Sequence, residues 1–207
     1  MPKTEFNEII CDWVRVKNHC RTTDNKDFTE KEPSELFKKK LLISEHSPIR
    51  LIEYDWTWRG MPYWVHAELA RHKFEKFIST QRDDRVQNDI PRGKKPQDAP
   101  VNFDGYANQQ NLIDAWRKRL CFKATREARS YAVSFKMALK AAGYEAEAAV
   151  LVPNCVYRCG CPEFKPCGFF KKFLRKAHDG SFNITDIEER YRLYNIMLDL
   201  ECRRAAK

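Results

Sequence analysis

The 207-residue chain has no apolar run near the roughly 18 residues that cross a membrane, and its first residues lack the apolar stretch of a signal peptide. We therefore expect a cytoplasmic protein with no membrane partner. The chain also has no glycine-rich phosphate loop, no Gly-x-Ser-x-Gly and no His-Glu-x-x-His, which excludes the common nucleotide-binding and hydrolase signatures. In the cytoplasm its eight cysteines are expected to be thiols or metal ligands rather than disulfides.

The charge of the chain is strongly positive. It has 38 lysine and arginine residues against 29 acidic residues, a net charge of +9, and 43% of its residues are hydrophobic. This composition predicts a folded domain whose partners are anionic or phosphorylated. Because the basic residues are spread along the whole chain, they suit a phosphate-binding pocket at least as well as a nucleic-acid-binding surface. We do not expect nucleic acid to be the partner.

The apolar pattern predicts an α+β fold, with long helices packed on a small antiparallel sheet. Apolar residues alternate over 49–58, which predicts a strand. They recur at helical spacing in four segments, the last of which should end at Gly143: 4–20, 34–43, 63–79 and 108–142.

Turn signals and a capping pattern complete the expected outline. A turn is expected at 60–62, and a long surface loop at 87–107, where prolines and glycines recur. The last helix is expected to begin near Thr185, with Thr185 and Glu188 as a capping box.

Three consecutive side chains, Arg71, His72 and Lys73, form the first candidate binding motif. Arginine offers a planar fork for carboxylate, phosphate or a ring carbonyl, and lysine offers a compact charge. If they lie on the predicted helix, they point about 100° apart and cannot all face one ligand unless the helix end or a partner chain surrounds it. An ordinary solvated helix face is the alternative.

A second polar segment follows, from Ser79 to Arg85. Its Arg-Asp-Asp-Arg run, 82–85, suits either a phosphate clamp or a surface knot of salt bridges, which would contribute little stability. In the predicted long helix, Arg119 lies beside an apolar line and needs an anion or a carboxylate partner. We expect a ligand contact there, and local pairing by Arg126 and Glu127 is the alternative.

Four cysteines lie within thirteen residues: Cys155, Cys159, Cys161 and Cys167. Such a group suggests zinc or an iron-sulfur centre. The spacing differs from paired Cys-x-x-Cys knuckles, so free thiols in a structured loop are the default interpretation and a metal site at these four cysteines is the candidate beside it.

In their order and spacing these motifs resemble the flavin-dependent thymidylate synthase (ThyX) family. That family shows a His-Ser-Pro corner, a strand, an Arg-His-Arg triplet, a nucleotide loop with Ser and Arg, and then a long helix with Asn near its start and a buried Arg. The corresponding residues here are His46-Ser47-Pro48, Arg71-His72-Lys73, Asn108, Leu112, Arg119-Leu120-Cys121, Ala124, Glu127 and Pro153 to Gly168. The resemblance covers about residues 8–168. It divides the chain into a flavin- and nucleotide-binding domain, 1–168, and a helical extension, 169–207, packed on the same domain.

The resemblance implies a homotetramer with FAD at subunit interfaces. It implies transfer of a one-carbon unit from methylenetetrahydrofolate to C5 of dUMP, with NADPH as reductant. Catalytic roles fall to Arg71 and Arg119, which would polarise the uracil ring. The flavin contacts implied are Ser47, Arg71, His72, Lys73 and Asn108. The nucleotide contacts implied are Gln81, Arg82, Arg85 and Arg119.

Two departures from the family pattern bear on the reaction. Lys73 replaces the usual third arginine of the triplet, and Ile49-Arg50 replaces Phe-Glu after the Ser-Pro corner. A related modification at C5 of a deoxyuridylate, such as hydroxymethylation, is therefore the first alternative. A non-catalytic basic module that binds nucleic acid through a cysteine-held metal is the second.

Overall fold

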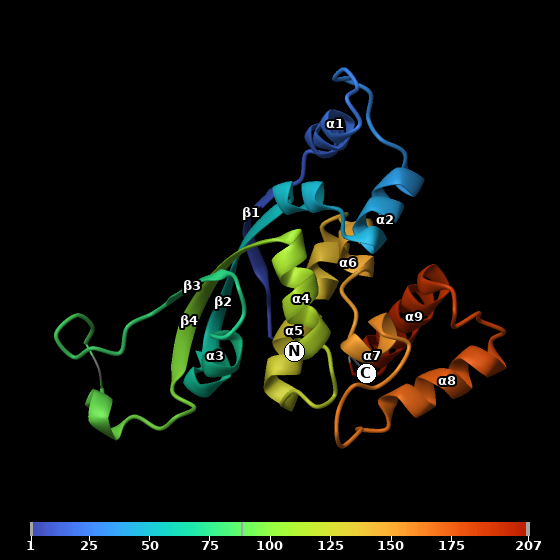
Figure 1. Cartoon of the computed structure of the whole chain (residues 1–207). Helices are drawn as coiled ribbons and strands as arrows, with labels where there is room; N and C mark the ends of the chain where they lie inside the picture. The colour runs from blue at the N-terminus through green and yellow to red at the C-terminus, as the bar shows by residue number, and fades with distance from the viewer. Residues whose placement is uncertain (1, 88, 206–207) are drawn as a thin grey trace.

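The computed structural model describes residues 2–87 and 89–205. Its centre is one antiparallel four-stranded sheet with the strand order β1-β2-β4-β3 (Figure 1). The strands are β1 (Glu5–Ile10), β2 (Glu53–Pro62), β3 (Glu75–Ile78) and β4 (Pro100–Asn108). The longer helices are α1 (Trp13–Thr23), α2 (Glu35–Ser44), α4 (Gln109–Arg119), α5 (Arg126–Ala141), α8 (Phe169–Asp179) and α9 (Ile187–Ala205). Shorter helical segments are η1 (Ser47–Leu51), α3 (Tyr63–Leu69), η2 (Arg92–Lys94), α6 (Glu145–Ala149) and α7 (Asn154–Tyr157). The α+β prediction is confirmed.

Aromatic side chains join the sheet to α4 and α5. The indole of Trp56 on β2 lies 6.3 Å from that of Trp116 on α4 and 5.0 Å from the ring of Phe135 on α5, both edge to face. Gly105 on β4 leaves room for this indole, because a Cβ at that position would lie 2.2 Å from its Cζ2 atom. One face of the sheet is thereby fixed against the two helices.

The N-terminal segment corrects the predicted helix over 4–20. Residues 5–10 form β1, and Phe6 packs edge to face against Phe135. The helix α1 begins only at Trp13, because the side chain of Asp12 caps it by accepting from the backbone N–H of Arg15 at 2.8 Å. The segment predicted as one helix therefore contains a strand, β1, followed by a helix, α1.

The middle of the chain contains more strand than the sequence indicated. The predicted strand 49–58 begins later, at Glu53, and continues through the predicted turn at 60–62. The predicted helix 63–79 ends at Leu69, and residues 75–78 pair with β4 as β3. The predicted loop 87–107 is also wrong in its second half, since residues 100–108 form β4. Every second residue of β4 is buried: Val101, Phe103, Gly105 and Ala107.

The predicted long helix over 108–142 is two helices, α4 and α5, joined by a connector at residues 120–125. Thr125 caps α5 by accepting from the N–H of Ala128 at 3.3 Å. The end predicted at Gly143 is confirmed: this residue has a φ of +92°, and the N–H of Tyr144 bonds to the carbonyl of Leu139.

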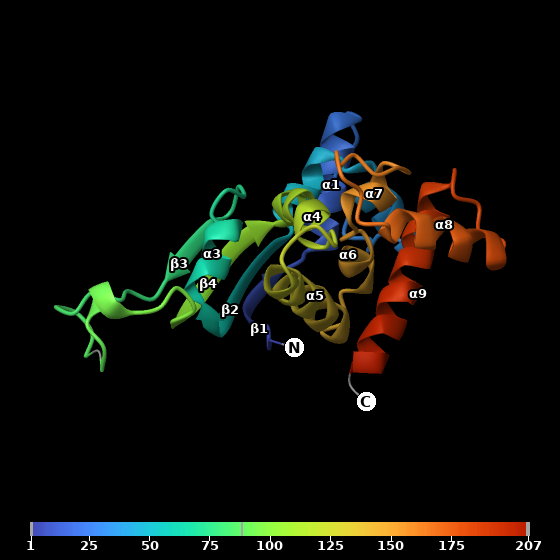
Figure 2. The same cartoon turned by 90° about the horizontal axis from the view of Figure 1, so that it is seen from below.

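The last helix begins at Ile187, two residues after the predicted start. Its cap is Asp186, whose carboxylate accepts from the N–H groups of Glu188 and Glu189, so the proposed pairing of Thr185 with Glu188 is wrong. The helices α8 and α9 lie at the end of the molecule away from the β3–β4 hairpin (Figures 1 and 2). Their buried residues, among them Phe173 and Tyr191, belong to the same hydrophobic core as the sheet. Among the described residues, no helix has the length and apolar character needed to span a bilayer.

Candidate active site

The candidate site lies where the turn after α3 meets the end of α4. The triplet predicted on a helix lies instead in that turn, because α3 ends at Leu69 and buried Phe74 leads the chain into β3. This turn brings His72 to Arg119, the last residue of α4: the Nε of Arg119 donates to the Nε2 of His72 at 2.9 Å. Two residues that are 47 positions apart thus form one contact.

His72 is neutral at pH 7 in this environment. Burial of the half-buried imidazole, followed by the positive charges of Arg119, Lys76, Arg71 and Lys118, lowers the pKa of His72 from 6.5 to about 4. A neutral ring that accepts at Nε2 carries its proton on Nδ1. The Nδ1–H of His72 is therefore a donor directed away from Arg119.

Glu68 on α3 is part of this site and was missed by the sequence analysis. Its carboxylate accepts from the Nη1 of Arg119 at 2.6 Å and from the hydroxyl of Thr125 at 2.7 Å. The side chains of Arg119 and Glu68 are only 14% and 21% exposed, so their ion pair is partly shielded from water. The sequence feature that could have indicated a role for Glu68 is its position three residues before the Arg71-His72-Lys73 triplet. The acidic partner that the burial of Arg119 requires is therefore Glu68 and not the local carboxylate of Glu127.

Arg71 and Lys73 flank this pair and are exposed to solvent. Arg71 is close enough to contribute to the lowered pKa of both His72 and Arg119. Within residues 2–87 and 89–205, neither Arg71 nor Lys73 forms a salt bridge. Their charges are thus available to an anionic ligand beside Arg119.

Ser47 and Asn108 lie at the opposite end of α4. The backbone N–H of Gln109 bonds to the carbonyl of Ile52 at 2.9 Å, which attaches η1 to the start of α4. Asn108 caps α4 by accepting from the N–H of Asn111 at 2.9 Å. Since α4 rises about 1.5 Å per residue, Asn108 is roughly 16 Å along the helix from Arg119.

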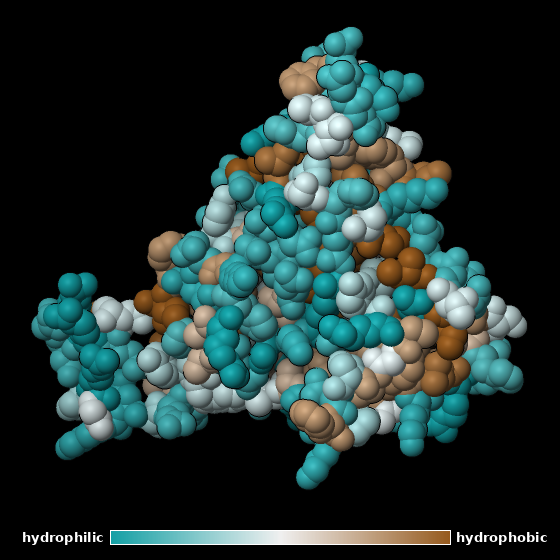
Figure 3. Space-filling view, viewed as in Figure 1, coloured by the Kyte–Doolittle hydropathy of each residue, from teal (hydrophilic) through white to brown (hydrophobic). Residues whose placement is uncertain are grey.

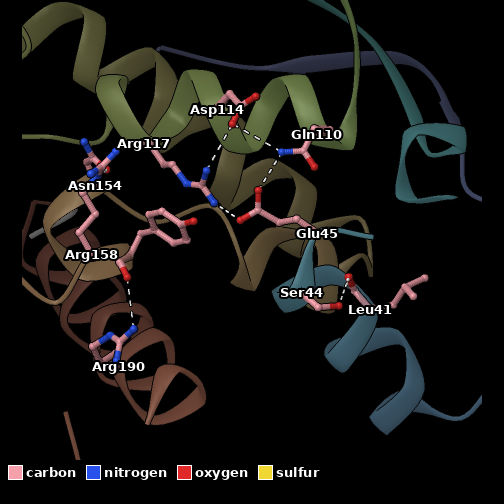
Figure 4. Close-up of polar contacts among 10 residues, drawn as sticks. Leu41, Ser44, Glu45, Gln110, Asp114, Arg117, Asn154, Arg158 and Arg190 are labelled. Carbon is pink, nitrogen blue, oxygen red and sulfur yellow. Dashed lines mark hydrogen bonds and ion pairs between the residues drawn. The ribbon is translucent and has the colours of Figure 1, made fainter. Parts of the chain in front are cut away.

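A network of polar contacts joins Glu45, two residues before Ser47, to α4 (Figure 4). Arg117 pairs with Glu45 and with Asp114, and its guanidinium lies 3.6 Å from the centre of the Tyr157 ring. Gln110 adds a bond of 2.8 Å to Glu45. Glu45, at the end of α2, has a φ of +54° and immediately precedes the His46-Ser47-Pro48 corner. The network therefore determines where this corner lies relative to α4.

The predicted nucleotide contacts Gln81, Arg82 and Arg85 are not brought to Arg119 within one chain. They lie in the connection between β3 and β4, which extends away from α4 and α5 at the left of Figure 1 and is covered by hydrophilic side chains in Figure 3. Arg82 pairs with Asp84 at 2.6 Å, the local salt bridge that the sequence offered as an alternative. Arg85 is exposed.

The cysteine cluster does not form the predicted metal centre. Across residues 2–87 and 89–205, no three His, Cys, Asp or Glu side chains are grouped so that they could hold a metal ion. The Sγ of Cys159 is directed toward the carbonyl of Ile184, at 3.4 Å. Cys155 is buried, which together with neighbouring thiols raises its pKa to about 12, whereas Cys167 is exposed. The prediction of free thiols in a structured loop fits this arrangement better.

Solved structures share this architecture at low sequence identity. Thymidylate synthase X (ThyX) from Helicobacter pylori, solved with FAD and dUMP, is similar with a TM-score of 0.61 and 13% identity, over 73% of this chain and 99% of that chain. A second Helicobacter pylori ThyX complex with FAD and dUMP is similar with a TM-score of 0.59 and 12% identity, over 70% of this chain and 97% of that chain. The UMP/dUMP methylase PolB from Streptomyces cacaoi, bound with 5-Br dUMP, is similar with a TM-score of 0.59 and 13% identity, over 72% of this chain and 94% of that chain. Neither a protein-family model nor a curated protein matches the sequence. The chain therefore has the fold of the flavin-dependent thymidylate synthases.

Proposed function

We propose that this protein is a flavoenzyme that modifies C5 of a deoxyuridine monophosphate. Its reaction would transfer a one-carbon unit from methylenetetrahydrofolate to dUMP, with FAD as cofactor and NADPH as reductant. The observation that carries the proposal is the cluster of Arg71, His72 and Arg119 at the end of α4, on a fold shared with enzymes solved in complex with FAD and dUMP.

Arg119 is suited to hold a pyrimidine carbonyl. Two of its nitrogens are fixed by His72 and Glu68, so the guanidinium is held in one orientation before a ligand arrives. Among the described residues its Nη2 forms no hydrogen bond that would occupy it, so this nitrogen remains as a donor for a ligand. A preorganised cation at this position would stabilise negative charge on the uracil ring as C5 becomes nucleophilic.

The polar and cationic residues at the two ends of α4 match the needs of a dinucleotide cofactor. Arg71 and Lys73, which form no salt bridge with the described residues, offer cationic donors at one end, and Ser47 and Asn108 offer hydroxyl and amide groups at the other. Bound FAD would supply the electron transfer that this reaction requires. The role of the protein is then to bind two anionic ligands and orient the pyrimidine, which needs no protein nucleophile.

A partner subunit would complete the site in a homotetramer. The proposed residues are split between the α4 region and the β3–β4 connection, which do not meet in one chain. Four cavities of 390–450 Å³ in the described part of the chain are lined by other residues. We infer that Gln81, Arg82 and Arg85 of one subunit bind the nucleotide phosphate beside Arg119 of another.

A second C5 product is the alternative reaction. Lys73 cannot make the bidentate contact of an arginine, so the flavin or nucleotide would be held differently at that position. The fold is shared both with ThyX and with a UMP/dUMP methylase, which supports considering more than one product for this architecture. Hydroxymethylation of a deoxyuridylate would use the same site.

One incubation tests the proposal and separates the two products. The purified protein is supplied with FAD, NADPH, methylenetetrahydrofolate and dUMP, and nucleotides are analysed by mass spectrometry. We expect dTMP, with loss of product in Arg119→Gln and little change in the neighbouring control Lys118→Gln. A hydroxymethylated product would favour the alternative reaction. Absence of any modified nucleotide, at every protein concentration, would contradict both.

A further inference from the structure

A cavity of about 450 Å³ lies between α8, α9 and the connector at 120–125, outside the site proposed above. Its volume is within the range of roughly 300–1,000 Å³ that is typical of small-molecule sites. The apolar part of its lining consists of Phe122, Phe169, Met197 and Leu200. Phe122 and Leu200 are 41% and 48% exposed, so the apolar lining is accessible from solvent.

The aromatic wall of this cavity is held rigidly. The rings of Phe122 and Phe169 are stacked, with centres 4.8 Å apart and planes at 21°. The guanidinium of Arg129 lies 3.9 Å from the centre of the Phe122 ring and is itself fixed by two bonds, of 2.8 and 2.9 Å, to the carboxylate of Glu201. Phe122 therefore keeps its position without a ligand, and binding would cost little ordering of this wall.

The rim of the cavity is cationic. Lys172 and Lys176 are one helical turn apart on α8, and Arg204 projects from the last turn of α9. All three are exposed, and in the described part of the chain none of them forms a salt bridge. The one acidic lining residue, Glu201, is neutralised by Arg129. The charge at the rim is thus uncompensated.

We propose that this cavity binds a small aromatic anion: a flat ring system packs against the Phe122–Phe169 wall, and its acidic groups lie between Lys172, Lys176 and Arg204. The aromatic lining provides contact area for the ring. The three cations add charge-assisted hydrogen bonds to carboxylate, sulfonate or phosphate oxygens. This inference does not depend on the proposed reaction, because none of its residues belongs to the Arg119 site.

The probe is 8-anilinonaphthalene-1-sulfonate, an aromatic anion whose fluorescence rises on transfer from water to an apolar site. Its dissociation constant is measured for the full chain and two double variants. Lys172→Glu with Lys176→Glu reverses two rim charges. Lys171→Glu with Arg175→Glu makes the same change on the same helix at positions that do not line the cavity. Phe122→Ala tests the aromatic wall, and circular dichroism confirms folding of each variant.

We expect the rim variant and Phe122→Ala each to raise the dissociation constant at least about tenfold, and the matched control to change it less than about threefold. Equal weakening by both double variants would show general electrostatic attraction and would overturn the proposal. Absence of binding to the native chain would overturn it too. So would light scattering that shows a dimer dissociated by Phe122→Ala, because a second copy would then fill the cavity.

Discussion

The contact between His72 and Arg119 makes a quantitative prediction about protonation. The folded-state pKa of His72 is about 4, against 6.5 for an unperturbed imidazole, with burial as the largest cause and Arg119 as the next. If the whole difference in pKa is counted, it corresponds to a contribution of roughly 3 kcal/mol to the free energy of unfolding. Because the ring is only half-buried, solvent screening reduces our expectation to about 1–2 kcal/mol.

The sign of the resulting pH dependence follows from the direction of the change. Between pH 6.5 and about 4, the unfolded chain binds more protons at His72 than the folded chain does. The stability contribution of neutral His72 is therefore fully present above pH 6.5 and is lost as the pH falls toward 4. The same protonation would break the hydrogen bond from the Nε of Arg119, since a protonated ring has no acceptor.

The assay is an NMR titration of the His72 ring, assigned with a His72→Gln variant. We expect a midpoint near pH 4 in the native protein. Arg119→Gln should raise it by about one pH unit or more while leaving it below 6.5, because burial remains. Lys118→Gln, which removes the last and smallest of the charges acting on the ring, should raise it much less. A native midpoint near 6.5, or equal effects of the two variants, would refute this account of the site.

Three further predictions concern packing, the ion pair and the thiols. Gly105→Ala should lower the free energy of unfolding by about 2–3 kcal/mol in urea denaturation, because its new Cβ overlaps a buried indole, whereas Gly93→Ala, with open space around it, should be nearly neutral. Glu68→Gln should cost about 1–2 kcal/mol in the same assay by removing the partner of a partly buried arginine, and an unchanged midpoint would contradict this. Iodoacetamide at pH 8 should modify exposed Cys167 and spare Cys155, whose pKa is about 12; early modification of the latter in mass spectra would show that it is accessible.

Local signals determined how much of the fold could be predicted. The helix α2 was predicted almost to the residue, because Ser34 caps it and its apolar spacing is regular. The strand β4 was missed because prolines and a glycine suggested a loop. Gly105 is buried only because the indole of Trp56, from another strand, occupies the space of its side chain. That requirement is tertiary, so no local pattern reveals it.

The contacts of the candidate site could not be predicted from the sequence. The order of the motifs proposed His72 and Arg119 as candidates, and their contact depends on where α3 and α4 end, since both ends differ from the sequence prediction. Glu68 was missed because a single carboxylate on a helix carries no distinct signal until its partner is known. The cysteine spacing was overinterpreted, since short spacing alone does not direct thiols toward one point.

Binding of FAD tests the central claim most directly. The purified protein is titrated with FAD, and the bound flavin is measured by its visible absorption after gel filtration, for the native chain and for Arg71→Glu. We expect the native protein to retain flavin in an oligomeric peak and the variant, which reverses an exposed charge beside Arg119, to retain much less. A native protein that stays colourless at saturating FAD, in every oligomeric form, would contradict the account.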